Sequence, residues 1–133
     1  MSRRIVRSVV TLLATLAVVA GPAGPATAHH LPLGACSPSG DVCKSVRRVD
    51  GVRRLRIMLA ADYFERFRLC VTGPTGSPTC HTYRIRDLGA TFGSSIAWRA
   101  NFPFEGRGDY MAVWKFIGGG LVGRALGFHV GPA

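Results

Sequence analysis

Apolar and polar residues alternate with a period of two along much of this chain. Residues 54–60 show the pattern clearly, with Leu55, Ile57 and Leu59 on one face and Arg54 and Arg56 on the other. Such alternation turns one face of a strand toward a core and the other toward water. No stretch after residue 28 sustains apolar residues at helical spacing, so we expect strands rather than helices.

Clusters of Gly, Pro, Ser and Asp divide the alternating stretches into seven candidate strands. They cover residues 44–50, 54–60, 63–71, 79–87, 92–102, 110–117 and 121–130. Seven short strands at this spacing predict an all-β fold, an immunoglobulin-like antiparallel β-sandwich of about seven strands. Residues 29–43 lack the alternation and are expected to be irregular. His81 and Ala100 fall on inward positions of their strands, and we expect His81 to be a satisfied core residue.

One local motif supports the sandwich. Gly106 to Tyr110 open the penultimate candidate strand in the manner of a tyrosine corner, in which a Tyr hydroxyl bonds back to the chain upstream. Ala112 stands where an antibody domain carries its second cysteine. The domain is therefore expected to lack the disulfide that joins the two sheets of antibody domains.

The first 28 residues have the layout of an export signal. Arg3, Arg4 and Arg7 precede an apolar run over residues 9–20, and a Gly/Pro-rich stretch leads to small residues ending at Ala28. The run is shorter than the roughly 20 residues needed to span a bilayer. We expect cleavage after Ala28, a secreted, extracellular domain of residues 29–133, and no membrane span in that domain.

All four cysteines, Cys36, Cys43, Cys70 and Cys80, follow the expected cleavage site. An even number of cysteines in an exported chain indicates disulfides. Four cysteines allow three pairings, and sequence separation favours Cys36–Cys43 and Cys70–Cys80. Their spacing is not that of paired zinc knuckles.

The second of these disulfides sets a register for the middle hairpin. If Cys70 faces Cys80, then Arg68 faces Thr82 and Arg66 faces Arg84, all on the outer face. The expected anion- or partner-binding residues are then Arg66, Arg68, Arg84 and Arg86. The competing interpretation is a solvated strand face whose guanidinium groups separate into water.

The charge balance favours anionic partners. Removing three arginines with the signal leaves 14 of the 17 basic residues against 7 acidic ones, a formal charge of +7, and only Lys44 and Lys115 are lysines. Such a surface associates with polyanions such as acidic cell-wall polymers. An extracellular protein partner stays open, and no specific nucleic-acid site is expected.

The sequence contains few residues arranged as a catalytic site would require. No carboxylate pair can be placed together, no Gly-x-Ser-x-Gly elbow occurs, and oxidised cysteines offer no thiol nucleophile. We therefore expect a non-enzymatic binding or interaction module without a cofactor.

A copper-binding protein is the alternative function. Residues 108–114 and 123–130 resemble the last two strands of small copper-resistance β-sandwich proteins, which also begin with His after export. The resemblance implies copper(II) bound by the amine and ring of an N-terminal His29, in a geometry that suits a square-planar ion. That family has Asp-x-His between these strands, where this chain has Ile117 to Leu121, so only His29 carries over. The whole exported chain also resembles small secreted immunoglobulin-like proteins of GC-rich Gram-positive bacteria, which implies location and fold but no activity.

Overall fold

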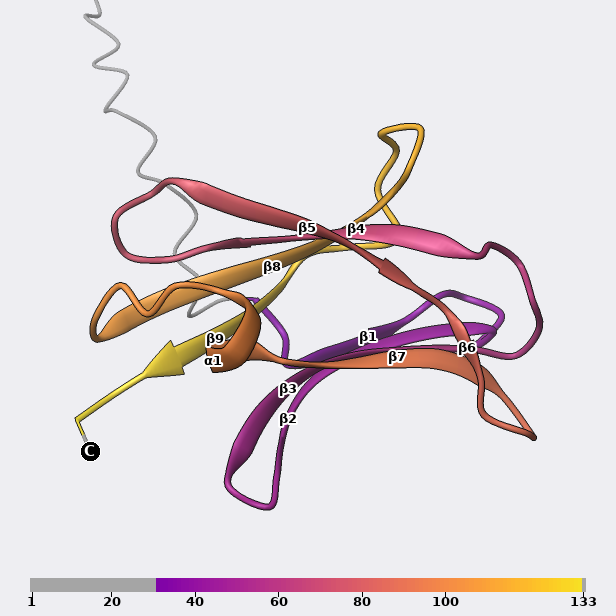
Figure 1. Cartoon of the computed structure of the whole chain (residues 1–133), viewed down its shortest axis with the longest axis horizontal. Coiled ribbons are helices and arrows are strands. Elements are labelled where there is room, and N and C mark those ends of the chain that lie inside the picture. Colours follow the sequence, from indigo (N-terminus) through magenta and orange to yellow (C-terminus); the bar gives the residue numbers. More distant parts are fainter. Residues whose placement is uncertain (1–30, 133) are drawn as a thin grey trace, which may run out of the picture.

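The structure, a computed structural model, describes residues 31–132 and consists of two antiparallel sheets packed face to face (Figure 1). The first sheet has the order β1 (Gly34–Cys36), β2 (Val42–Val49), β3 (Val52–Leu59), β7 (Phe92–Ala97) and β6 (Arg86–Asp87). The second has the order β5 (Pro78–Arg84), β4 (Arg66–Thr72), β8 (Gly108–Phe116) and β9 (Leu126–Val130). The order β2-β3-β7-β6 facing β5-β4-β8-β9 corresponds to the A-B-E-D and C′-C-F-G sheets of immunoglobulin domains. The expected antiparallel β-sandwich is confirmed.

The period-two pattern accounts for the core. Leu55, Ile57 and Leu59 of β3 are buried, and they face Phe67 and Leu69 of β4 across the space between the sheets. Tyr110, Ala112, Trp114, Leu126 and Phe128 complete the second sheet's inner face. Burying each large apolar side chain contributes roughly 1.5–3 kcal/mol, so alternation alone selects which face of each strand turns inward.

Several strand boundaries differ from the expectation, and three of the differences change which residues pack in the sandwich. Residues 92–102 do not form one strand, because β7 ends at Ala97 and the short helix α1 (Trp98–Asn101) follows. This turn places Trp98 and Phe102 in the core and leaves Ala100 exposed, which corrects its expected inward position. Residues 34–36, expected to be irregular, pair with β2 as β1. The last strand begins at Leu126 rather than at residue 121, and Leu121 makes only an isolated bridge to Lys115.

Both disulfides are cross-strand links within one sheet. Cys36 pairs with Cys43 between β1 and β2, and Cys70 pairs with Cys80 between β4 and β5. Each pair occupies directly opposed register positions, where Cβ atoms are close. The favoured connectivity and the absence of an intersheet disulfide in the described chain are both confirmed.

The tyrosine corner is also present. The Tyr110 hydroxyl donates to the carbonyl oxygen of Gly106 at 2.7 Å and accepts from the Glu105 amide at 2.9 Å. Because Tyr110 is almost fully buried, these bonds fix the chain entering β8 against the core.

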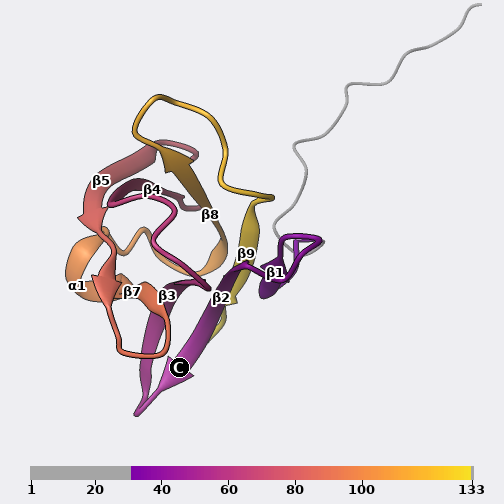
Figure 2. The same ribbon diagram turned by 90° about the vertical axis from the view of Figure 1, so that its right-hand side faces the viewer.

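The segment 79–87 is divided between the two sheets. β5 ends at Arg84, the amide of Ile85 donates to the Glu65 carbonyl, and Arg86 then pairs with Gly93 of β7. Figure 2 shows this passage along one side of the sandwich, opposite β1 and β9. Because β5 is an edge strand, His81 stays exposed although its register partner Leu69 is buried, so the expected core position of His81 is wrong. Its ring lies 5.2 Å from that of Phe102.

Among residues 31–132, no helix has the length and apolar character that crossing a membrane requires.

Candidate anion-binding site

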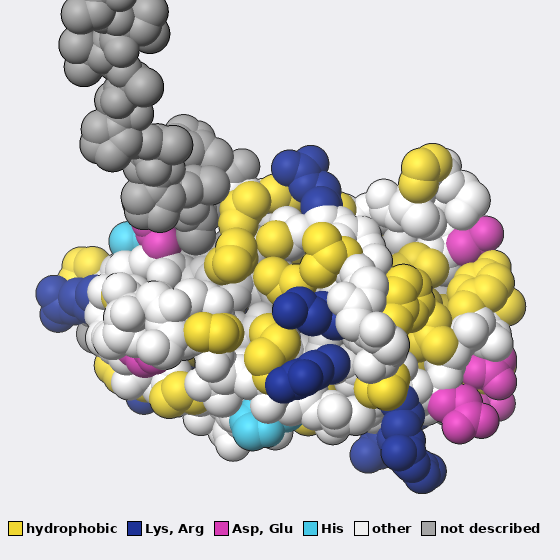
Figure 3. Space-filling model, turned by 90° about the horizontal axis from the view of Figure 1, so that it is seen from above, with side chains coloured by type: hydrophobic (Ala, Val, Ile, Leu, Met, Phe, Trp, Pro, Cys, Tyr) yellow, Lys and Arg dark blue, Asp and Glu magenta, His cyan; other side chains and the backbone are white. Residues whose placement is uncertain are grey.

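Three of the four expected arginines lie on the outer face of the β5-β4-β8-β9 sheet. Arg66 is opposite Arg84, and Arg68 is opposite Thr82, which confirms the register inferred from the disulfide. Lys115 of β8 lies on the other side of Arg68. We call Arg66, Arg68, Arg84 and Lys115 the outer basic patch. Figure 3 looks onto this face, where basic side chains lie among hydrophobic ones and acidic side chains lie toward the ends.

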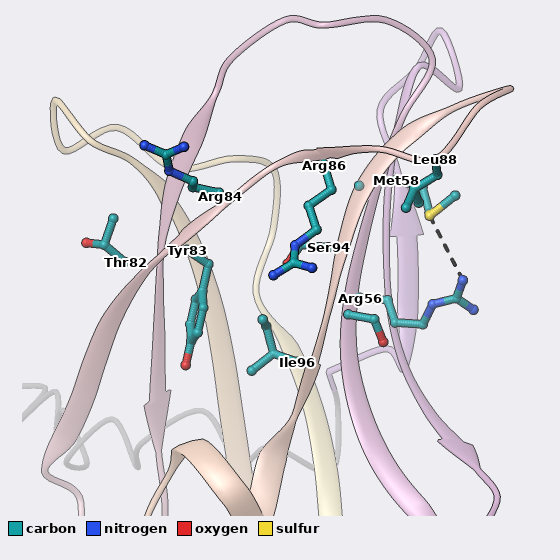
Figure 4. Close-up of a pocket in the computed structure, with 11 residues that line it drawn as sticks. Arg56, Met58, Thr82, Tyr83, Arg84, Arg86, Leu88, Ser94 and Ile96 are labelled. Carbon is teal, nitrogen blue, oxygen red and sulfur yellow. Dashed lines mark hydrogen bonds between the residues drawn. The ribbon is translucent and has the colours of Figure 1, made fainter.

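Arg86 does not join this face. It belongs to β6 of the other sheet, because the chain crosses between the sheets at Ile85. The crossing breaks the alternation that would have kept Arg84 and Arg86 on one side. In Figure 4 Arg86 extends into the space lined by Tyr83, Ser94 and Ile96, whereas Arg84 points away.

Arg86 instead lines a pocket of about 510 Å³ at the opening between the two sheets. Two further arginines line it, Arg84 from β5 and Arg56 from β3. In the view of Figure 4 these three side chains form a row with Arg86 in the middle, and we call them the arginine row. No carboxylate belongs to the lining of this pocket, and Arg84 joins the arginine row to the outer basic patch.

The three guanidinium groups have little internal compensation. No ion pair in the described part of the chain involves any of them, and Arg56 makes only a long contact from its Nη2 to Met58 Sδ at 4.0 Å. Asp62, Glu65 and Asp87 line a separate hollow that shares Arg84. A guanidinium carries five N–H donors in a planar fork that matches carboxylate and phosphate oxygens. The arginine row therefore offers several N–H donors to an anion.

The rest of the pocket combines hydroxyl groups with apolar surface. Ser94, Ser95 and Thr82 contribute hydroxyls, and Leu88 and Ile96 contribute aliphatic surface.

Tyr83 adds an aromatic wall to the same pocket. Its hydroxyl is buried without a hydrogen-bond partner, and burial raises the pKa of that phenol. Tyr83 therefore stays neutral near pH 7 and adds no negative charge beside the arginines.

A second basic group lies near the end of β9 and was not anticipated. Arg53 lies 4.7 Å from the ring centroid of Phe128, and Arg99 lies 4.1 Å from that of Phe104. Burial, and secondarily the charge of Arg48, lower the pKa of Arg53. These two guanidinium groups are already stacked on aromatic faces, so they are less available to an anion than the arginine row.

Arg56 and the second basic group escaped the sequence reasoning for one reason. Alternation assigns a side chain to a face but not to a neighbour on another strand. The one usable signal was that Arg54 and Arg56 share the polar face of an otherwise apolar strand.

The expected copper ligand His29 lies outside the described residues. Within residues 31–132, no group of three or more His, Cys, Asp or Glu side chains is arranged to hold a metal ion. His129 Nδ1 is 2.7 Å from Asp109 Oδ1, a side-chain hydrogen bond between β8 and β9.

The chain matches no protein-family model, no curated protein and no solved structure.

Proposed function

We propose that this protein is an exported, non-enzymatic binding module that engages an anionic polymer through the arginine row and the adjoining outer basic patch. The observation that carries the proposal is the pocket whose lining includes Arg56, Arg84 and Arg86 but no carboxylate. Two local disulfides, which favour an oxidising compartment, support export.

The spacing of the charges supports a polymer over a single small ion. Arg84, Arg86 and Arg56 are spread across the opening, and Arg84 leads on to Arg66 and Arg68. A chain with repeated anionic groups can contact several of these cations at once. The hydroxyl and apolar parts of the pocket suit the uncharged parts of the same polymer, such as sugar or polyol units.

A pair of charge-matched double variants tests the site. R84Q/R86Q removes two charges from the pocket, whereas R48Q/R107Q removes two from a different hollow near the end of β9. Binding to teichoic acid and to heparin is measured by titration at about 0.1 M salt. At about 1 kcal/mol for each basic residue at an anionic surface, R84Q/R86Q is expected to weaken binding about thirtyfold.

The control variant distinguishes binding at a defined site from attraction by the net charge of the whole protein. R48Q/R107Q is expected to change affinity by less than about threefold, because these two charges line a separate hollow and exposed charges are screened beyond about 10 Å at 0.1 M salt. Equal loss in both variants would mean that net charge alone drives binding and would overturn the assigned site. Elution of the wild type at the same salt as an unrelated protein of equal charge would overturn the function.

A further inference from the structure

Lys44 is a buried lysine on the inner face of the sandwich. It shares one face of β2 with Val42 and Val46, so its side chain enters the space between the sheets, and it is only 4% exposed. Lysine is almost never fully buried without a partner, because removing an ammonium group from water is costly.

The ammonium group is only partly compensated. Lys44 Nζ donates to the backbone carbonyl of Arg124 and lies 5.2 Å from the ring centroid of Trp114. An ammonium has three N–H donors, so one carbonyl and one aromatic face leave donor capacity unused. No carboxylate in the described chain forms an ion pair with it.

Burial makes Lys44 easier to deprotonate. Desolvation, and secondarily the positive charge of Arg124, lower the pKa of Lys44 to about 8. The neighbouring strands present Ala35, Ile57 and Trp114 to this region, and none of these side chains carries a charge. Among the described residues, no acidic side chain lines the pocket around this ammonium.

Lys44 also lines a pocket that is distinct from the arginine row. The pocket has a volume of about 420 Å³, within the range of roughly 300–1,000 Å³ typical of small-molecule sites. Its walls include Val42, Phe116, Leu121 and Val122. Phe116 is 41% exposed and Leu121 is 60% exposed, so the apolar lining opens to solvent.

The loop over Lys44 is held closely against it. The Val122 amide donates to the Trp114 carbonyl at 2.8 Å, and Gly123 follows with φ of +67°. A methyl group at Gly123 would lie 3.2 Å from Lys44 Nζ, so a residue without a side chain fits best there. The loop thus brings the Arg124 carbonyl and the apolar Val122 to the same ammonium.

We propose that this pocket binds a carboxylate with an apolar tail, of the fatty-acid class, with the carboxylate accepting hydrogen bonds from Lys44 Nζ and the tail lying against Phe116, Leu121 and Val122. A single buried cation inside apolar walls matches one charged head group joined to a hydrocarbon chain. The pocket differs in this respect from the arginine row, which spreads several cations over a polar opening. Arg124, also in the lining, adds a second positive charge near the head group.

Decanoate and decan-1-ol are the probes, and calorimetric titration of the purified protein at pH 7 is the measurement. Decanoate is expected to bind at least about tenfold more tightly than the alcohol, because hydrogen bonds to a charged group contribute roughly 1.5–3 kcal/mol. Lys44→Met should remove that preference, whereas the matched Lys115→Met should leave it within about twofold. R84Q/R86Q should not affect decanoate, so this inference and the proposed polymer site can fail separately.

NMR of wild-type protein with ¹⁵N-labelled lysines tests the proposal without relying on the folding of a variant. Decanoate is expected to move the Lys44 Nζ signal and to raise its apparent pKa, with no change in the Lys115 signal. Binding of decanoate should also weaken by up to about tenfold per pH unit above pH 8, as the free Lys44 loses its proton. Equal affinity for decanoate and decan-1-ol, or an unchanged Lys44 signal at saturation, would overturn the proposal.

Discussion

The two lysines of this chain belong to different sheets, but their side chains lie against opposite faces of strand β8. Lys44 packs from β2 against the inner face of β8 at Trp114, and Lys115, the next residue of β8, points outward beside Arg68. The Lys115 ammonium is accessible to water, although it lies beside the cationic Arg68. Lys44 has an indole ring and a carbonyl, and its pKa falls to about 8. Within the environment of Lys44, loss of water lowers the pKa more than the like charge of Arg124 does.

Trp114 lies between the environments of Lys44 and Lys115, and we expect its replacement to lower the free energy of unfolding the most. Trp114 is 1% exposed and forms both the core surface of β8 and the aromatic face over Lys44. Trp114→Ala is expected to lower the free energy of unfolding by about 3–5 kcal/mol, since it opens a large cavity. Chemical denaturation followed by circular dichroism measures this loss.

Val113 provides the matched position on the outer face of the same strand. Because Val113 is only partly buried, Val113→Ala is expected to cost less than about 1 kcal/mol. Similar losses at Val113 and Trp114 would show that the two faces of β8 are not as different as their burial indicates.

Replacing each lysine by methionine compares the two environments directly. Lys44→Met keeps side-chain length and removes a desolvated charge, so it is expected to raise the free energy of unfolding at pH 7 by about 1–3 kcal/mol. The gain is limited because the Arg124 carbonyl loses its donor. Lys115→Met should stay within about 0.5 kcal/mol of wild type, as surface substitutions usually do.

The outcome that contradicts this comparison is a loss of stability in Lys44→Met. It would mean that the bond to Arg124 and the contact with Trp114 outweigh the desolvation of the ammonium group. Denaturation of both variants in one buffer distinguishes the cases.

Stability should rise with pH in a window set by Lys44. The pKa of Lys44 is about 8 in the folded chain and 10.5 when unfolded, so the unfolded chain binds more protons between these values. Stability then increases as pH rises from 8 toward 10, by up to about 1.4 kcal/mol per pH unit. The buried Tyr83 phenol, whose pKa is raised above 10, acts in the opposite direction only at higher pH.

Lys44→Met provides the control for this window. Its unfolding free energy should lack the rise between pH 8 and pH 10 that wild type and Lys115→Met show. Parallel profiles in all three proteins would assign the pH dependence to other groups. Denaturant midpoints at several pH values provide the measurement.

Local sequence patterns were sufficient to predict much of this fold. Alternation identified the buried face of β3, and cysteine separation gave both disulfides and the register of Arg66 against Arg84. These features depend on residues that are neighbours in sequence or lie across one hairpin. The tyrosine corner at Tyr110 is local in the same sense.

The features that escaped prediction depend on distant segments. Arg86 leaves the face of Arg84 because Ile85 bonds to Glu65 and the chain then pairs with β7. The expected strand began at Lys44, so its side chain was assigned to neither face of the sheet. Its actual partner, Arg124, lies 80 residues further along the chain. A sequence read segment by segment carries no information about such a contact.

The smallest expected effect comes from reversing the charge of Lys115 on the outer face of β8. Lys115→Glu replaces a like-charge neighbour of Arg68 by an opposite one, so a stabilisation of about 0.2–1 kcal/mol is expected at low salt. The pair is solvent-accessible, so the gain should vanish near 1 M salt, where charges are screened within about 3 Å. The change that Lys44→Met produces should persist at that salt, because the Lys44 ammonium is shielded from ions by the core. Denaturation at two salt concentrations measures both effects, and a salt-insensitive gain in Lys115→Glu would mean that packing, not charge, distinguishes the outer lysine.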